Sequence, residues 1–84
     1  MYTVYVLYSE KHAKIYIGYT SDLEKRFLSH NKLGTKGWTI KFRPWKLLYT
    51  EEFETKREAM IREKALKSAK GREFIWNLIK DIRD

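Results

Sequence analysis

The sequence predicts an α/β (α+β) fold in which a small three-stranded sheet, mixed or antiparallel, is flanked by helices in the order β-β-α-β-α-α. Residues 3–8 and 15–19 are runs rich in β-branched and aromatic side chains, separated by a short polar break. Two Ser/Thr-x-x-Glu patterns, each typical of a helix start, follow farther along the chain. A chain of 84 residues that is 43% hydrophobic holds enough apolar surface for one core. We therefore expect residues 1–84 to form a single domain.

The first two strands are expected to pair as an antiparallel hairpin, because only a short break separates them. The first capping pattern runs from Ser21 to Glu24, and we expect Ser21 to be the N-cap. The helix that it opens should extend to about Asn31. Its Leu23 and Phe27 lie one turn apart and should face the core.

The second half of the sequence predicts a loop, a strand and two helices. Residues 32–44 contain two glycines and a proline and are expected to form a long loop, and 45–50 are expected to form the third strand. A second capping pattern starts a helix at Thr55 that should end near Gly71 as its C-terminal cap. The last helix should bury a face with helical spacing, formed by Phe74, Ile75, Leu78, Ile79 and Ile82.

The charge balance favours a polyanionic partner. The chain carries 18 Lys and Arg against 11 Asp and Glu, a formal net charge of +7, and residues 32–50 hold five basic residues and no acidic one. Trp38 and Trp45 lie in the same segment, and cations interleaved with aromatic rings are typical of nucleic-acid surfaces. A solvated basic surface is the alternative.

Composition excludes several classes of site. The chain has no cysteine, which excludes disulfides, iron–sulfur clusters, thiolate zinc sites and thiol nucleophiles. Apolar runs are too short to span a membrane, and the first residues lack the layout of a secretory signal, so we expect a cytoplasmic protein without a membrane partner.

Several polar side chains are spaced as in a known family of enzymes. Tyr5 precedes Tyr16 by eleven residues, Arg26 follows Tyr16 by ten and His30 by fourteen, and Glu63 lies on the following predicted helix. Together with the triplet Tyr16-Ile17-Gly18, this pattern resembles the GIY-YIG nuclease superfamily, in particular its small stand-alone bacterial members. The chain is also similar to the N-terminal nuclease domain of the bacterial repair excinuclease. The match runs from about residue 3 to about residue 67.

Each of these side chains also has an ordinary structural explanation. Tyr5 and Tyr16 on paired strands are ordinary sheet aromatics, unless their phenols project over one face and position a water. Arg26 and His30 are one helical turn apart, and a guanidinium fork suits a phosphodiester that gains charge in its transition state. Glu63 shares a helix face with apolar residues, where a carboxylate needs either a salt bridge or a cation such as magnesium.

The resemblance implies a metal-dependent endonuclease that hydrolyses DNA phosphodiester bonds, nicking or structure-selective, in DNA repair or recombination. It implies catalytic roles for Tyr5, Tyr16, Arg26 and His30, and a single Mg²⁺ (or Mn²⁺) held by Glu63. We expect these five side chains to converge on one concave face. RNA stays open as a substrate, and so does a partner protein or a homodimer.

The alternative function is a catalytically weak or inactive nucleic-acid-binding module of the same fold. It is favoured by Thr3, which stands where the family signature has a glycine. Either function needs nucleic-acid contacts, and Asn77 is a further residue expected to support the site. The residues expected to make those contacts are Gly18, Lys36, Trp38, Lys41, Arg43, Lys64 and Lys67. Gly18 is expected to let a phosphate approach because it has no side chain, and an ordinary turn glycine is the alternative.

Overall fold

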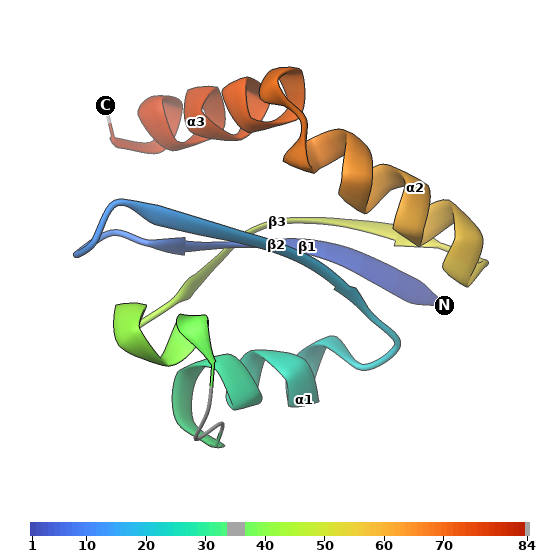
Figure 1. Ribbon diagram of the computed structural model, residues 1–84, viewed down its shortest axis with the longest axis horizontal. Helices are drawn as coiled ribbons and strands as arrows, with labels where there is room; N and C mark the ends of the chain where they lie inside the picture. The colour runs from blue at the N-terminus through green and yellow to red at the C-terminus, as the bar shows by residue number, and fades with distance from the viewer. Residues whose placement is uncertain (34–36, 84) are drawn as a thin grey trace.

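The structure is a computed structural model that describes residues 1–33 and 37–83, and it has a three-stranded sheet between two layers of helices (Figure 1). All neighbouring strands are antiparallel, in the order β2-β1-β3, so β1 is central and the other two strands are edges. The fold class and element order predicted from the sequence are therefore confirmed. The strands are β1 (Tyr2–Ser9), β2 (Lys14–Thr20) and β3 (Lys46–Phe53).

Alternation along β1 divides the core between the two faces of the sheet. Val4 and Val6 belong to a cluster under α2 (Lys56–Lys67) and α3 (Ala69–Arg83). Tyr5 and Leu7 belong to a second cluster on the opposite face. That face is covered by α1 (Leu23–Leu28), the π-helical turn η1 (Ser29–Leu33) and the 3-10 helix η2 (Trp38–Phe42). Figure 1 shows the two helix layers on either side of the sheet.

The first helix begins one residue later than the sequence predicts. Asp22, rather than Ser21, is its N-cap, because the Asp22 carboxylate accepts a hydrogen bond from the backbone N–H of Lys25 at 3.1 Å. The predicted extension to about Asn31 is made by η1, which continues α1 with a wider turn.

Residues 32–44 are not one uninterrupted loop, because Trp38–Phe42 form η2. Lys36, predicted to contact nucleic acid, lies outside the described residues. The third strand is longer than predicted and ends at Phe53, because Glu51 and Phe53 pair with Val4 and Tyr2 of β1. Glu51 and Glu52 are therefore part of an edge strand, and Glu54 follows it directly.

Gly71 is not the C-cap of α2. That helix ends at Lys67 with Ser68 as its cap, and Gly71 lies in the first turn of α3. A Cβ at residue 71 would overlap the backbone of Ala65 and Leu66, so the glycine allows α3 to start in contact with the end of α2. Of the predicted apolar face of α3, Ile75 and Ile79 are buried, Leu78 is partly buried, and Phe74 and Ile82 are exposed.

Thr55 is the N-cap of α2, as predicted: its hydroxyl accepts from the backbone N–H of Glu58 at 3.2 Å. The helix is tied to β3 by an ion pair between Arg62 and Glu51 at 2.8 Å, and Glu51 also accepts a hydrogen bond from the Tyr49 hydroxyl. These contacts fix the position of α2 relative to the sheet. Within the described ranges, no helix is long and apolar enough to cross a membrane.

Candidate functional site

The hydroxyl of Tyr5 is the centre of a polar cluster between β1 and the α1–η1 segment. Tyr5 is 1% exposed, and its side chain points toward the face that α1 covers. Arg26 Nε donates to the Tyr5 hydroxyl at 3.4 Å, and His30 Nε2 lies 2.9 Å from the same oxygen. The spacing of Arg26 and His30 thus brings both side chains to one phenol, which is part of the convergence that the sequence predicts.

Gly18 makes the position of this phenol sterically possible. It pairs with Tyr5 across the hairpin, and a Cβ at residue 18 would lie 2.6 Å from the Tyr5 hydroxyl oxygen. The sequence-based expectation was that the missing side chain leaves room for a phosphate. In the structure, the hydroxyl of Tyr5 occupies this space instead.

His30 is buried and held through both ring nitrogens. Its Nδ1 lies 3.1 Å from the hydroxyl of Thr39 on η2. Burial, as the largest cause, together with the positive charges of Arg26 and Arg43, lowers the pKa of His30 to about 4. The ring is therefore neutral at pH 7 and has one donor and one acceptor.

The hydrogen bonds are consistent with one direction through the cluster. Arg26 can only donate, so the Tyr5 oxygen accepts that bond, and the phenol keeps its own proton to donate to His30 Nε2. With Nε2 accepting, His30 Nδ1 carries the proton and donates to Thr39. Burial, as the largest cause, raises the pKa of Tyr5 to about 12, so the phenol stays protonated at neutral pH.

Tyr16 lies beside this cluster on β2. Its ring centroid is 4.6 Å from that of His30 and 6.2 Å from that of Tyr5. Hydrogen bonding to Tyr5 in the first place, and to Tyr16 to a lesser degree, raises the pKa of Arg26. The guanidinium of Arg26 therefore stays positive, and a pocket of about 290 Å³ opens beside it, lined by Tyr16, Arg26, Ser29, His30, Gly37, Trp38 and Thr39.

Glu63 lies in the other helix layer. The expectation that all five side chains converge on one face is wrong for Glu63, because α2 packs on the face of the sheet opposite Tyr5. Tyr5, Tyr16, Arg26 and His30 do share one face. Its side chain is 18% exposed and pairs with Lys67 at 3.5 Å, which is one of the salt bridges that the sequence allowed. Its charge still contributes to the raised pKa of Tyr5.

The residues predicted to bind nucleic acid have different environments. Trp38 is 47% exposed, and Lys41, Lys64 and Lys67 are exposed as well. Arg43 instead donates to the backbone carbonyls of His30, at 2.6 Å, and Ser29, at 3.2 Å. Charge pattern alone assigned Arg43 to a phosphate, whereas its guanidinium supports the turn that carries His30.

Asn77 is exposed on α3, in the layer opposite Tyr5, and none of the side-chain hydrogen bonds of the described residues includes it. The structure therefore does not bring Asn77 to the polar cluster.

Two residues of the site were not predicted. Thr39 orients His30, and its backbone carbonyl accepts from Trp45 Nε1 at 2.8 Å. The Asn31 side chain binds the backbone of Trp45, directly before β3. Its Oδ1 accepts from the Trp45 N–H at 2.6 Å, and its Nδ2 donates to the Trp45 carbonyl at 2.9 Å. Both contacts join segments on either side of residues 34–36, and the sequence carries no spacing signal for them.

The buried neutral His30 predicts a loss of stability in acid. Its pKa is about 4 in the folded protein and about 6.5 when unfolded, so the unfolded chain binds more protons between these values. The free energy of unfolding should therefore fall as pH drops from 7 toward 4, with a His30 share of about 1–3 kcal/mol. Urea unfolding at several pH values, compared with His30→Gln, measures this share. An equal drop in both proteins would show that carboxylates alone cause it.

The chain is similar to known proteins over most of its length. A family described as the GIY-YIG catalytic domain matches residues 1–77. A UPF0213 protein of Bacillus velezensis is 44% identical over 64 residues, which cover 73% of this chain and 65% of that protein. A UPF0213 protein of Streptococcus agalactiae is 41% identical over 70 residues, covering 83% of this chain and 78% of the relative.

A solved structure supports the same relationship. The solution NMR structure of a UPF0213 protein from Bacillus halodurans has a TM-score of 0.54 and 30% sequence identity, covering 93% of this chain and 85% of that one. The hydrogen-bonded tyrosine, arginine and histidine lie within the residues that the family match covers. The chain belongs to the GIY-YIG catalytic domain family.

Proposed function

We propose that this protein is a metal-dependent endonuclease that hydrolyses DNA phosphodiester bonds, one strand at a time and at particular DNA structures, in repair or recombination. The observation that carries the proposal is the Tyr5 hydroxyl held between Arg26 Nε and His30 Nε2 above Gly18. The phenol is buried, and its two partners Arg26 and His30 line the adjacent open pocket, in which a reacting water can be positioned.

The hydrogen bonds suggest a role for each side chain. The Tyr5 oxygen accepts from Arg26, donates its proton to His30, and keeps one lone pair that can accept from a water. Arg26 has further N–H groups with which to stabilise the charge that develops on the phosphate. His30, with a pKa of about 4, orients the phenol and is a poor proton acceptor at neutral pH. Thr39 orients the His30 ring through its hydrogen bond with Nδ1.

Glu63 is the residue that would hold a divalent cation. Its carboxylate is largely shielded from solvent, and its charge is the smallest of the causes that raise the pKa of Tyr5, after burial. No group of three or more potential ligands occurs in the described part of the chain. One carboxylate fits magnesium, which keeps several waters and takes substrate phosphate as a ligand. The bound ion would supply positive charge to the phosphate and lower the pKa of a nearby phenol or water. With the cation bound, the ion pair between Lys67 and Glu63 would be broken.

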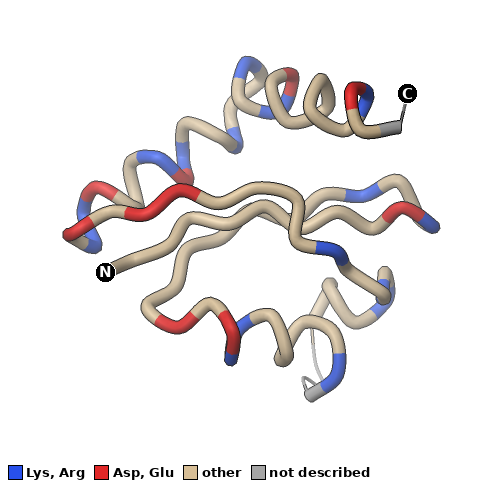
Figure 2. Tube along the Cα trace, turned by 180° about the vertical axis from the view of Figure 1, so that it is seen from behind, with Lys and Arg blue, Asp and Glu red and all other residues tan. Residues whose placement is uncertain are grey.

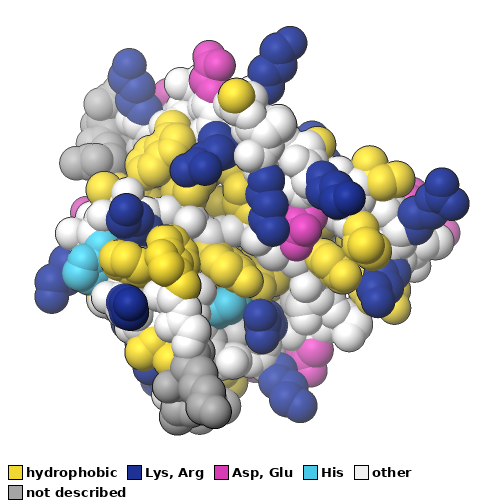
Figure 3. Space-filling model, in the orientation of Figure 1, with side chains coloured by type: hydrophobic (Ala, Val, Ile, Leu, Met, Phe, Trp, Pro, Cys, Tyr) yellow, Lys and Arg dark blue, Asp and Glu magenta, His cyan; other side chains and the backbone are white. Residues whose placement is uncertain are grey.

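The charge distribution favours a polyanion at the β2 edge of the sheet. The acidic residues Glu51, Glu52 and Glu54 lie along or directly after β3, the opposite edge strand. Figure 2, turned to the other side of the molecule, shows acidic residues gathered where β3 leads into α2. In Figure 3, Lys and Arg side chains stand around a band of hydrophobic side chains on the front face. A phosphate backbone would therefore be repelled from β3 and attracted to the β2 side.

A nicking assay tests the proposal. Supercoiled plasmid and branched DNA are incubated with Mg²⁺ or Mn²⁺, and the conversion of supercoiled to relaxed circles is followed with and without chelator. We expect metal-dependent nicks, and we expect Glu63→Gln to slow them by about 10²-fold or more. Glu73→Gln, which removes an exposed carboxylate on α3, is the matched control. Nicking that survives both the chelator and Glu63→Gln would contradict the proposed role of Glu63.

A binding module without turnover is the second candidate. Two observations favour it: Thr3 replaces the first-motif glycine, and Lys67 already neutralises Glu63 at 3.5 Å. The same assay separates the two, because a binding module retards DNA in the presence of metal and leaves the plasmid supercoiled.

A further inference from the structure

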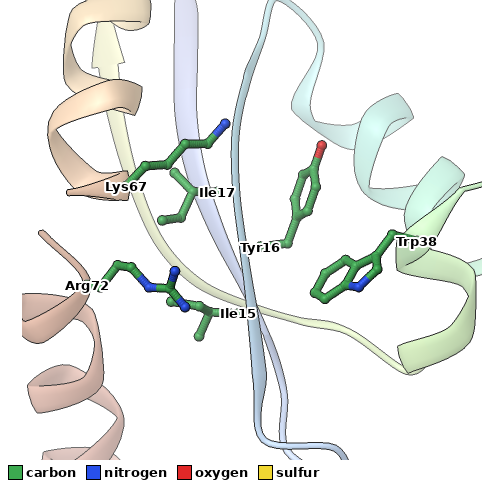
Figure 4. A pocket seen from close by; sticks show the side chains of 6 residues that line it. All are labelled: Ile15, Tyr16, Ile17, Trp38, Lys67 and Arg72. Carbon is green, nitrogen blue, oxygen red and sulfur yellow. The ribbon is translucent and has the colours of Figure 1, made fainter. Parts of the chain in front are cut away.

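A pocket of about 360 Å³ lies across the edge strand β2, next to the Tyr5 cluster. It is lined by Ile15, Tyr16, Ile17, Trp38, Lys67 and Arg72. Figure 4 shows Tyr16 and Trp38 on one side of β2, and Lys67 and Arg72 on the other. The pocket therefore has an aromatic wall contributed by Tyr16 and η2 and a cationic wall contributed by α2 and α3.

The aromatic wall lies at the protein surface, and neighbouring rings hold it in position. Trp38 is 47% exposed, and its ring centroid lies 4.6 Å from that of Phe42 and 5.9 Å from that of Trp45. Tyr16 stacks against Trp38 with 29° between the ring planes and 6.5 Å between centroids. Because neighbouring rings support the indole, its position is fixed without a ligand. A large exposed ring held in this way suits stacking against a second flat ring.

The cationic wall fits phosphate. Arg72 is exposed, and none of the side-chain hydrogen bonds or ion pairs of the described residues includes its guanidinium. Figure 4 shows the guanidinium extending from α3 toward Ile15 of β2. Lys67 points to the same strand farther along, and its pair with Glu63 leaves 53% of its side chain exposed. A planar ring on one side and two cations on the other are the recognition elements of a nucleotide.

Tyr16 connects this pocket to the polar cluster, because it lines both this pocket and the smaller one beside Arg26 and His30. We infer that the pocket takes one unpaired nucleotide next to the phosphate to be cleaved, with its base on Trp38 and its phosphate at Arg72 and Lys67. A base inside a duplex has both faces covered by its neighbours and cannot stack on Trp38. This inference rests on the proposed function and specifies its substrate as nucleic acid with an unpaired nucleotide at the cleavage site.

Binding measured without metal tests the inference separately from cleavage. Fluorescein-labelled decathymidylate and a blunt duplex are titrated in the presence of a chelator, and their anisotropy is followed at one fixed salt concentration. We expect Trp38→Ala to weaken binding to the single strand by about 5- to 150-fold, and binding to the duplex by less than about threefold. Trp38→Phe keeps an aromatic face and should retain most of the single-strand affinity. Equal weakening of single-strand and duplex binding by Trp38→Ala would contradict stacking on an unpaired base.

The cationic wall is tested with a charge-matched pair of variants. Arg72→Gln should weaken single-strand binding more than Arg57→Gln, which removes an equal charge from an exposed position on α2 outside the pocket. If the two changes weaken binding equally, Arg72 contributes only general charge and the phosphate position is wrong.

A change in the ligand tests the stacking without any mutation. A decamer of abasic deoxyribose phosphates should bind the unaltered protein about as weakly as decathymidylate binds Trp38→Ala. Equal affinity for the abasic and thymidine strands would overturn the inference even if the protein cuts DNA. Conversely, base-dependent binding without any nicking would support the pocket and contradict the proposed nuclease.

Discussion

Arg26→Ala is expected to lower the rate of DNA cleavage by about 10²–10³-fold while leaving most of the binding affinity. Arg26 donates to the Tyr5 hydroxyl and stays positive beside the open pocket, so its charge acts mainly on the charge that develops in the transition state. Single-turnover cleavage and metal-free binding, measured on the same DNA, separate the two effects.

The neighbouring Lys25 offers a matched control for this change. It is exposed on the same helix and carries the same charge, and only its backbone N–H takes part in the cap, so Lys25→Ala keeps that bond. We expect Lys25→Ala to cleave nearly as fast as the unaltered protein. Loss of binding and of cleavage by the same factor in Arg26→Ala would instead make Arg26 a general phosphate contact.

Local sequence patterns predicted the strands well and their ends poorly. The runs around Val4 and Ile17 are strand-like by composition alone, whereas β3 continues to Phe53 because β1 offers it hydrogen-bonding partners. Likewise, Gly71 looks like a helix end by residue type, and its actual role depends on the backbone of Leu66 lying against it. Where an element ends is decided by tertiary contacts that the chain pattern does not contain.

In the candidate site, too, local spacing was predicted and tertiary contacts were not. Arg26 and His30 were predicted together, because their side chains are one helical turn apart and that spacing survives the change from α1 to the wider turn of η1. Thr39 was not predicted, because its contact with His30 depends on how η2 folds back onto η1. Arg43 was assigned to phosphate, since charge alone does not reveal whether a cation faces solvent or backbone carbonyls.

The environment of Glu63 could be predicted only in part. Its apolar helix face predicted either a salt bridge or a cation, and the structure has the salt bridge to Lys67. The position of α2 on the face of the sheet opposite Tyr5 is set by tertiary packing, which no local pattern predicts. Burial is the main cause of the raised pKa of Tyr5, and the charge of Glu63 is the smallest of its causes.

Gly18→Ala is expected to slow cleavage by about 10²-fold with a smaller effect on DNA binding. The added methyl group would lie 2.6 Å from the Tyr5 hydroxyl oxygen and 2.8 Å from the ring carbon that carries it. Because Tyr5 is fully buried, its ring cannot swing into solvent, and the hydroxyl must shift relative to Arg26 and His30. Cleavage rate, metal-free affinity and thermal unfolding are measured for the variant.

The double variant Tyr5→Phe/Gly18→Ala identifies the cause. Removing the hydroxyl removes the atom closest to the new methyl group, so the alanine should cost less stability in the Tyr5→Phe background than in the unaltered protein. It should also cause little further loss of cleavage, because the phenol that it displaces is already gone. Additive losses in both properties would mean that Gly18 acts independently of Tyr5. Weakened DNA binding in Gly18→Ala, with the hydroxyl geometry intact, would instead support the expectation that the glycine makes room for the phosphate.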